Sequence, residues 1–306
     1  MLADPDPSSA IAPDGRPTRE LRDQLRRIPS VRNACSVLSA WLQTIGVLAL
    51  AVWIDHPLAW LLAFCLMGRS NVLLAILSHE AAHRLLFANR RFNDFVGRWL
   101  LAYPVFLPID LYRRGHMNHH RDEFGPNEPD VPLYRGYPIP RASMRRKLTR
   151  DALGITGVRI MRGLLRGLRS PSAAVREEAW RIVVTQTAIF GLFAALGWWY
   201  LYPLLWLLPH LTVWRVLNRL RSIAEHGGMK RSDDRRLTTH SVHQSRLARL
   251  VLVPYNTGWH LAHHVDSGIP MRNLPAFHAE LVRSGYVQPG LEHGGYFALW
   301  RRLSSG

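Results

Sequence analysis

The sequence has few cysteines and almost no lysine. Cys35 and Cys65 are the only cysteines in 306 residues, so neither a disulfide framework nor a cysteine-based zinc or iron–sulfur site is indicated. Lysine accounts for 2 of the 39 basic residues and arginine for the other 37, a bias that indicates a GC-rich, bacterial genome. The sequence also contains no internal repeat and no haem-binding or ferredoxin-like segment.

Apolar residues are concentrated in four long runs, each close to the roughly 20 residues that cross a bilayer as a helix. The expected spans are about residues 36–54, 58–77, 182–200 and 201–217. The fold class that we predict is an all-α integral membrane protein with four transmembrane helices in two hairpins. The alternative is a soluble protein with buried core helices, which seldom occur as paired runs of this length.

The distribution of arginine predicts the orientation in the membrane. Segment 84–181 is rich in arginine, whereas the turns at 55–57 and 198–203 contain no Lys or Arg. Cytoplasmic loops accumulate Lys and Arg, so both termini and the long loop are expected on the cytoplasmic side of the membrane. The expected location is a bacterial inner membrane. Topology and anionic lipid headgroups therefore explain the net charge of +17, and nucleic-acid binding is not expected.

The expected domains follow from these spans. The first fifteen residues are acidic and lack the basic and apolar regions of a signal peptide, so we expect no signal peptide and a disordered start. Residues 17–31 have an amphipathic pattern, typical of a helix on the membrane surface or of a solvated lead-in. We predict a tail with an interfacial helix over 1–35, a membrane domain over 36–285 with a cytoplasmic cap at 78–181 and 218–285, and a C-terminal tail over 286–306.

Eight of the fifteen histidines lie in three clusters, SHEAAH, GHMNHH and WHLAHH. Spacings of three and four residues place side chains on one face of a helix. The predicted topology puts all three clusters on the cytoplasmic side. Eight imidazoles exceed the four ligands usual for one zinc, so the pattern predicts two metal ions. The clustered histidines are His79, His83, His116, His119, His120, His260, His263 and His264.

Other polar residues are candidates for supporting roles. His226 follows the fourth predicted helix and lies level with the clusters, so we expect it to be a ninth ligand. Glu80, Glu225 and Asp130 are candidate hydrogen-bond acceptors for ligand N–H groups, and the alternative for each is an ordinary surface role. His240 and His243 are expected in a solvated loop. The remaining histidines, His56, His210, His278 and His293, are read as structural.

The motif HEAAH at 79–83 also matches the zinc metalloprotease pattern, in which two helical histidines bind zinc and the glutamate is the general base. A single three-ligand zinc site would leave the other six clustered histidines unused. The three clusters together therefore favour a larger metal centre over a protease.

The order of HEAAH, HMNHH and HLAHH, separated by two hydrophobic hairpins, resembles the membrane-bound fatty acid desaturase and hydroxylase superfamily. The stretch VPYNTGWHLAHHVDSGIPMRNLPAFH is similar to bacterial desaturases, and RSIAEHGG is similar to a Glu-His element that supplies a further ligand. The resemblance covers about residues 36–285. It implies a non-haem di-iron centre held by the eight clustered histidines and His226.

The resemblance implies an O2-dependent oxidoreductase that introduces a C=C bond into the acyl chain of a lipid or acyl thioester. The alternative on the same di-iron centre is a hydroxylase or ketolase of an alkane, acyl or carotenoid chain. Because the sequence has no electron-transfer segment of its own, electrons must come from a separate protein. A ferredoxin, rubredoxin or cytochrome b5-type protein is expected, and an acidic donor would be attracted by the cationic cytoplasmic face.

Overall fold

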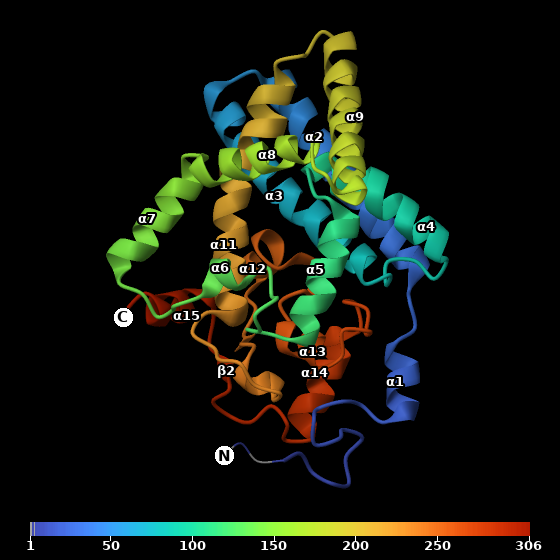
Figure 1. The fold of residues 1–306 in the computed structure, drawn as a ribbon, viewed down its shortest axis with the longest axis vertical. Helices are drawn as coiled ribbons and strands as arrows, with labels where there is room; N and C mark the ends of the chain where they lie inside the picture. Colours follow the sequence, from blue (N-terminus) through green and yellow to red (C-terminus); the bar gives the residue numbers. More distant parts are fainter. Residues whose placement is uncertain (1, 3) are drawn as a thin grey trace. The chain divides into compact units, whose positions relative to one another are not determined.

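The computed structural model describes residue 2 and residues 4–306, and most of the secondary structure is helical (Figure 1). The chain divides into two units. Unit 1 comprises the described residues of Met1–Pro29 together with Gly115–Met144 and Leu220–Gly306. Unit 2 comprises Ser30–Arg114 and Arg145–Arg219. Three helices contribute residues to both units: α5 (Ile109–Arg121), α7 (Arg141–Ala152) and α11 (Val213–His226).

The other elements belong to one unit each. Unit 2 contains α2 (Ser30–Ile54), α3 (Pro57–Ala82), α4 (Arg90–Phe95), the π-helix η1 (Val96–Ala102), the 3-10 helix η2 (Tyr103–Val105), α8 (Ile155–Gly167), α9 (Ala173–Ala195), the π-helix η3 (Tyr202–Leu207) and α10 (Leu208–Leu211). Unit 1 contains α1 (Arg19–Leu25), α6 (Val131–Tyr134), η4 (Arg235–Leu237), α12 (Arg246–Val251), η5 (Pro254–Asn256), α13 (His260–Val265), α14 (Leu274–Arg283) and α15 (Tyr296–Leu303). The two-residue strands β1 (Ser241–Val242) and β2 (Glu292–His293) pair in parallel in unit 1.

Helices α2 and α3 are the two described helices that are long and apolar enough to cross a membrane. They contain 25 and 26 residues with mean hydropathies of 1.9 and 1.8, and at 1.5 Å per residue each exceeds the roughly 30 Å of a hydrocarbon core. His56 caps α3 by accepting a hydrogen bond from the Leu58 N–H at 3.2 Å. Both helices run beyond the predicted limits, and α3 continues to Ala82 and thereby includes His79.

Gln43 and Arg69, the polar residues in these apolar runs, contact each other. The Arg69 Nη1 donates to the Gln43 Oε1 at 2.8 Å. A guanidinium group in an apolar environment is costly unless a polar partner accepts its hydrogen bonds. The hydrogen bond between α2 and α3 provides such a partner.

The second predicted hairpin differs from the structure. Helix α9 begins at Ala173 and ends at Ala195, so it is shifted toward the N-terminus relative to the expected span 182–200. The expected span over 201–217 is not one regular α-helix. This stretch consists of η3 and α10, then a break at Thr212 with φ −120° and ψ −84°, and then the start of α11. Pro203 and Pro209 lack the N–H needed for regular α-helical hydrogen bonding, which explains the irregular geometry.

The segment between α4 and α5 is also irregular. The π-helix η1 is followed by η2, and Phe106 then adopts a left-handed conformation with φ 57°. Carbonyl groups freed by such a break need other donors. The Gln186 side chain of α9 supplies them, since its Nε2 donates to the carbonyl oxygens of Tyr103 and Pro104 at 2.7 and 3.1 Å.

The N-terminal segment is ordered where the structure describes it, contrary to the expected disorder; residues 1 and 3 of that prediction lie outside the described residues. The Asp6 N–H donates to the Ser284 carbonyl oxygen at 2.7 Å, and Ile11 is buried. Gly15 lies against the Tyr286 ring with φ 84°. A backbone hydrogen bond to a distant residue and the burial of Ile11 therefore order a segment whose own sequence predicts no structure.

Helix α1 is shorter than the amphipathic stretch 17–31, since it covers Arg19–Leu25. Its arginines contact a carboxylate of the same unit. Arg22 Nε and Arg26 Nη2 lie 3.2 and 2.7 Å from the oxygens of Asp266, which follows α13 directly. These two ion pairs connect α1 to the end of the third histidine cluster.

Candidate metal centre

Three helix segments of unit 1 carry seven of the predicted ligands. Helix α13 is short, and all six of its residues, including His260, His263 and His264, are buried. The last part of α5 carries His116, His119 and His120, which are also buried. Helix α11 ends at His226, where Gly227 and Gly228 follow, the latter with φ 77°. A glycine with positive φ is the usual way to end an α-helix, so the sequence itself fixes this terminus.

Four of these histidines form one compact set. The potential ligand atoms of His119, His226, His260 and His264 all lie within 4.8 Å of one another, and all four side chains are buried. The Nε2 atom of His260 is 3.1 Å from the Nε2 of His226 and 3.0 Å from the Nε2 of His264. A cation at about 2.1 Å from two imidazole nitrogens, with a right angle between the bonds, would separate them by about 3.0 Å. The spacing therefore suits imidazoles that share a metal ion.

The Nδ1 atoms of three histidines in this set face hydrogen-bond acceptors. The Nδ1 of His119 lies 2.5 Å from Glu128 Oε1, and the Nδ1 of His226 lies 2.9 Å from the Thr238 carbonyl oxygen. The Nδ1 of His264 lies 2.5 Å from Glu123 Oε1. An acceptor at Nδ1 favours the tautomer that carries its proton there, and this leaves the Nε2 lone pair available for a metal.

His116, His120 and His263 form a second set within the same unit. The Nε2 atoms of His116 and His120 are 3.1 Å apart, and the ring centroid of His263 is 4.6 Å from that of His120. His120 also lies next to the first set, because its ring centroid is 4.3 Å from that of His264. Seven adjoining imidazoles exceed the four ligands of a tetrahedral ion, so the cluster is consistent with a di-metal site.

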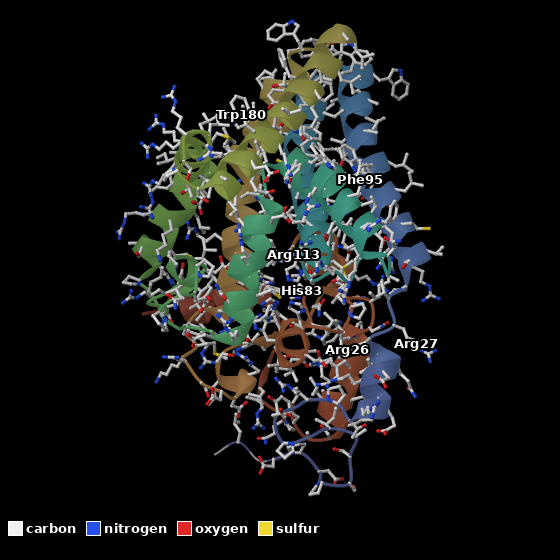
Figure 2. All side chains as sticks on the ribbon, turned by 45° about the vertical axis from the view of Figure 1, so that its right-hand side comes forward. Arg26, Arg27, His83, Phe95, Arg113 and Trp180 are labelled. Carbon is white, nitrogen blue, oxygen red and sulfur yellow. The ribbon has the colours of Figure 1, made fainter. Side chains whose placement is uncertain are left out.

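The two histidines of HEAAH lie at the end of α3, in unit 2: His79 is on its last turn and His83 follows its last residue. The ring centroids of His79 and His83 are 4.7 Å apart. Arg113 of α5, labelled with His83 in Figure 2, holds the end of the same helix. Its Nε donates to the Ala82 carbonyl oxygen at 2.9 Å and its Nη2 to that of Ala81 at 3.2 Å. Arg113 also forms an ion pair with Asp94 at 2.7 Å. These bonds connect the start of α5 with the helix that carries HEAAH.

The three acidic candidates have different environments. Glu225 is buried, and its Oε1 lies 3.6 Å from the His260 Nδ1 and 3.6 Å from Arg221 Nη1. Glu80 is buried on α3. Within the described part of the chain, no histidine nitrogen lies within 4.0 Å of the Asp130 carboxylate.

Sequence reasoning missed the two carboxylates that contact ligands most closely, Glu123 and Glu128. Glu123 comes three residues after His120, so its helical spacing could have identified it. Glu128 lies in the GPNEPD loop, and its carboxylate also accepts a hydrogen bond from the Phe124 N–H. The loop folds back because Gly125 leaves room for Asp122 and Phe124 has φ 60°. That close approach has no local sequence signal.

Arg235 of η4 balances the charge of Glu123. Its Nη1 lies 2.6 Å from Glu123 Oε1, and its Nη2 donates to the His120 carbonyl oxygen at 2.7 Å. Burial raises the pKa of Glu123, and the charge of Arg235 acts in the opposite direction. Arg235 thus supports the second and third clusters together.

Burial also favours neutral imidazoles in the first set. It lowers the pKa of His226, His260 and His264 well below the ordinary histidine value. For His119, burial acts in the same direction, but the hydrogen bond and charge of Glu128 outweigh it and the pKa of His119 is raised. Neutral imidazole is the form that binds metal ions.

The histidines outside the clusters make other contacts. His56 caps α3, His210 Nδ1 lies 2.9 Å from Asn71 Oδ1, and the ring of His278 lies 4.3 Å from that of Trp259. His240 directly precedes β1 and is buried, so the expectation of a solvated loop is wrong for this residue. Its Nε2 is 2.7 Å from the Gly227 carbonyl oxygen and its Nδ1 is 3.1 Å from His293 Nε2. His243 is exposed.

Comparison with known families agrees with this metal-binding arrangement. The family model described as "Fatty acid desaturase" matches residues 52–294, a range that includes all nine predicted ligands. The chain belongs to the fatty acid desaturase family. It is therefore an oxidoreductase whose histidine clusters are those of a desaturase, and the protease reading of HEAAH loses its support.

Curated relatives of this desaturase-family chain act on different molecules. It is 27% identical over 270 residues to the dihydrorhizobitoxine desaturase of Bradyrhizobium elkanii, covering 83% of this chain and 75% of the relative. It is 27% identical over 280 residues to a sphingolipid delta(4)-desaturase/C4-monooxygenase of Bos taurus, covering 84% and 79%. A shorter match, 29% over 86 residues, links it to the sn-1 oleoyl-lipid 12-desaturase of Arthrospira platensis, covering 28% and 23%.

Proposed function

We propose that the protein is an O2-dependent di-iron desaturase that introduces a C=C bond into the acyl chain of a lipid. The observation that carries the proposal is the set of four buried histidines in unit 1. The Nε2 of His260 lies 3.0–3.1 Å from those of His226 and His264, and three of the four Nδ1 atoms face hydrogen-bond acceptors. An unactivated C–H bond is too strong for side-chain acid–base chemistry, so the reaction requires a metal or cofactor. Family membership supports iron as that metal.

We assign the nine ligands to two ions. His119, His226, His260 and His264 would hold one, and His116, His120 and His263 would hold the other together with His79 and His83 of α3. Two observations support the second assignment. The Nε2 atoms of His116 and His120 are 3.1 Å apart. In addition, Arg113 joins α5 to the end of α3 three residues before His116.

Bound irons would supply O2 activation and the removal of hydrogen from the substrate. The chain's own residues have other tasks in this proposal. Glu123, Glu128 and the Thr238 carbonyl orient three imidazoles, and the charge of Arg235 opposes the burial that raises the pKa of Glu123. Burial of the ligands excludes water, which protects a reactive site from solvent.

Hydroxylation of an acyl or related chain is the second candidate. It is favoured by one relative whose name combines a desaturase with a C4-monooxygenase, both on a sphingolipid. Desaturation removes two hydrogens, whereas hydroxylation inserts oxygen, and both reactions use the same kind of metal centre. The products therefore distinguish them by mass.

The remaining parts of the proposal concern the membrane and the electron donor. We propose four spans with both termini in the cytoplasm, supported by α2 and α3 and by the arginine-rich segment between residues 84 and 181. The net charge of +17 favours an acidic donor such as a ferredoxin or rubredoxin. Turnover with that donor should decrease as ionic strength rises.

The function is tested on the full chain purified in its native membrane lipids. Two irons per chain and a product lighter by two hydrogens are expected. His260→Ala should lose metal and turnover, whereas His243→Ala, which removes an exposed histidine of the same unit, should retain both. One zinc per chain, or turnover without O2, would refute the di-iron proposal, and a product that gains oxygen would establish the hydroxylase instead.

A further inference from the structure

Helix α8 and the turn that follows it carry a stripe of four arginines in unit 2. Arg159, Arg162, Arg166 and Arg169 are spaced by three and four residues, so at about 100° per residue they fall within an arc of roughly 80°. All four are exposed. In the part of the chain that the structure describes, none of them has a carboxylate oxygen within 4.0 Å. The stripe therefore presents cationic donors that this unit leaves unneutralised.

The opposite face of α8 is fixed by close packing. A Cβ atom at Gly157 would lie 2.3 Å from the Leu211 carbonyl oxygen, so the helix approaches α10 more closely than any side chain would permit. A Cβ atom at Gly167 would lie 3.4 Å from side-chain atoms of Val175 and Ala179 of α9, which is an ordinary packing distance. These contacts set the rotation of α8 about its axis, and with it the outward direction of the arginines.

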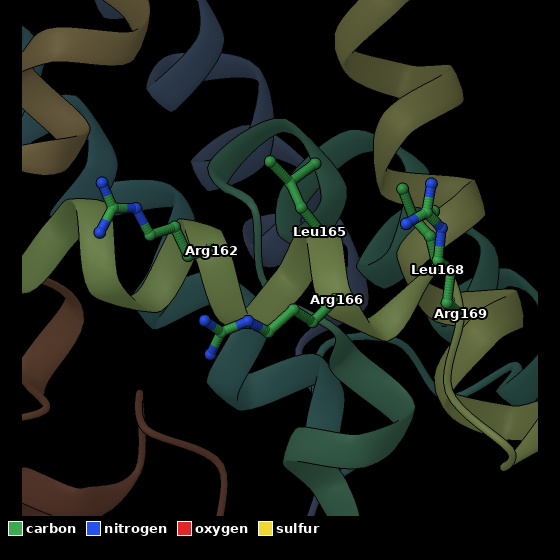
Figure 3. A pocket seen from close by; sticks show the side chains of 5 residues that line it. All are labelled: Arg162, Leu165, Arg166, Leu168 and Arg169. Atoms are coloured by element: carbon green, nitrogen blue, oxygen red, sulfur yellow. The ribbon is translucent and has the colours of Figure 1, made fainter.

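Two cavities meet at Leu165. One has a volume of about 490 Å³ and is lined by Arg162, Leu165, Arg166, Leu168 and Arg169 (Figure 3). The guanidinium groups of Arg162 and Arg166 both extend toward the N-terminal end of the helix in this view. The other cavity has a volume of about 330 Å³, and its lining is mostly apolar. It is lined in part by Met161, Leu164, Leu165, Ile182, Phe190 and Leu207.

The adjacent cavities are complementary to a ligand with an anionic head and an apolar tail. Guanidinium groups bind phosphate oxygens through paired N–H donors, and an apolar groove gains free energy when a hydrocarbon chain displaces water. We propose that α8 is a binding site for an anionic phospholipid, with its phosphate at Arg162 and Arg166 and one acyl chain in the groove beside Leu165. This site shares no residue with the metal ligands and does not depend on the catalytic proposal.

Binding is tested with the delipidated full chain in a nonionic detergent, by native mass spectrometry or titration. The probes are dioleoyl phosphatidylglycerol, dioleoyl phosphatidylcholine with the same chains, and inorganic phosphate. The double variant Arg162→Gln/Arg166→Gln should bind phosphatidylglycerol about thirtyfold more weakly than wild type, equivalent to about 2 kcal/mol at 1.4 kcal/mol per tenfold. Phosphatidylcholine and inorganic phosphate should each bind at least tenfold more weakly than phosphatidylglycerol to the unaltered chain.

The matched control is Arg90→Gln/Arg91→Gln, which removes two exposed charges from α4 in the same unit. It should bind phosphatidylglycerol like wild type. An equal loss in this control would show a general charge effect and overturn the site, as would unchanged binding in the α8 variant. Binding of inorganic phosphate as tight as that of phosphatidylglycerol would overturn the lipid assignment. Met161→Trp, which fills the groove, should weaken phosphatidylglycerol binding but not phosphate binding, and this variant keeps all the arginines.

Discussion

The Nδ1 atom of His264 lies 2.5 Å from Oε1 of Glu123, and neither side chain has exposed surface. The carboxylate comes from the end of the second histidine cluster and the imidazole from the third, 141 residues later. An acceptor in this position fixes both the tautomer and the ring plane of a metal ligand. The hydrogen bond between Glu123 and His264 therefore connects the second histidine cluster to the third.

The first prediction concerns this bond. Glu123→Gln keeps the shape of the side chain but removes its charge, so the imidazole becomes a weaker ligand. Metal affinity should fall about 10–100-fold, measured as metal retained after competition with a chelator. Asp122→Asn is the control, because Asp122 pairs with the exposed Arg231 instead of a histidine. Wild-type retention in Glu123→Gln would contradict the proposed role.

The second prediction concerns Arg235, which neutralises the buried Glu123. Arg235→Gln leaves that carboxylate without its cationic partner, so the free energy of unfolding should fall by about 3 kcal/mol. Arg231→Gln removes a similar ion pair at the surface, where the expected loss is at most about 1 kcal/mol. Thermal unfolding in detergent compares the two variants. Equal melting temperatures would show that the Arg235 pair contributes no more than a surface pair.

The third prediction concerns packing against α3. A Cβ atom at Gly68 would lie 2.2 Å from Val213 Cγ1, whereas nothing lies within 4 Å of the corresponding position at Gly46 of α2. Gly68→Ala should therefore destabilise the protein by about 1–3 kcal/mol, and Gly46→Ala should not. Both changes add one methyl group to an apolar helix. The melting temperatures of the purified variants test this difference, and a stable Gly68→Ala protein would show that α3 and α11 can move apart.

The fourth prediction concerns acid stability. Burial lowers the pKa of His240 and of His278 to about 4. Because the unfolded chain has histidine pKa values near about 6.5, it binds more protons than the folded protein between these limits. The free energy of unfolding should fall as pH decreases from 6.5 to about 4, by up to about 1.4 kcal/mol per pH unit for each histidine.

The variant His278→Phe tests the contribution of one of these histidines. It keeps a ring beside Trp259 but removes the titrating group. Its melting temperature should therefore change less than that of wild type between pH 7 and pH 5. An unchanged pH dependence would show that His278 does not contribute.

Local spacing was sufficient to predict the parts of the site that lie on single helices. His116, His119 and His120 share a face of α5, and His260, His263 and His264 share a face of α13, as their periodicity indicates. Apolar length likewise predicted α2 and α3. These signals depend on interactions within a few residues, which is why the sequence reveals them.

The parts that were missed depend on contacts between distant residues. Glu128 reaches His119 only because its loop folds back. The N-terminal segment is ordered by a backbone hydrogen bond from Asp6 to Ser284. The apolar stretch 201–217 has the composition of a spanning helix, yet its prolines prevent regular hydrogen bonding. Hydropathy measures composition and does not detect that break.

Helix α5 is continuous from Ile109 to Arg121, with Arg113 fixed by backbone and carboxylate contacts and the histidines following at once. Because a helix is stiff, the three imidazoles keep fixed angular positions about the helix axis relative to Arg113. Inserting a single residue after Arg114 would turn them together by about 100° relative to Arg113. The second histidine cluster is therefore specified by the count of residues from Arg113 as much as by the histidines themselves.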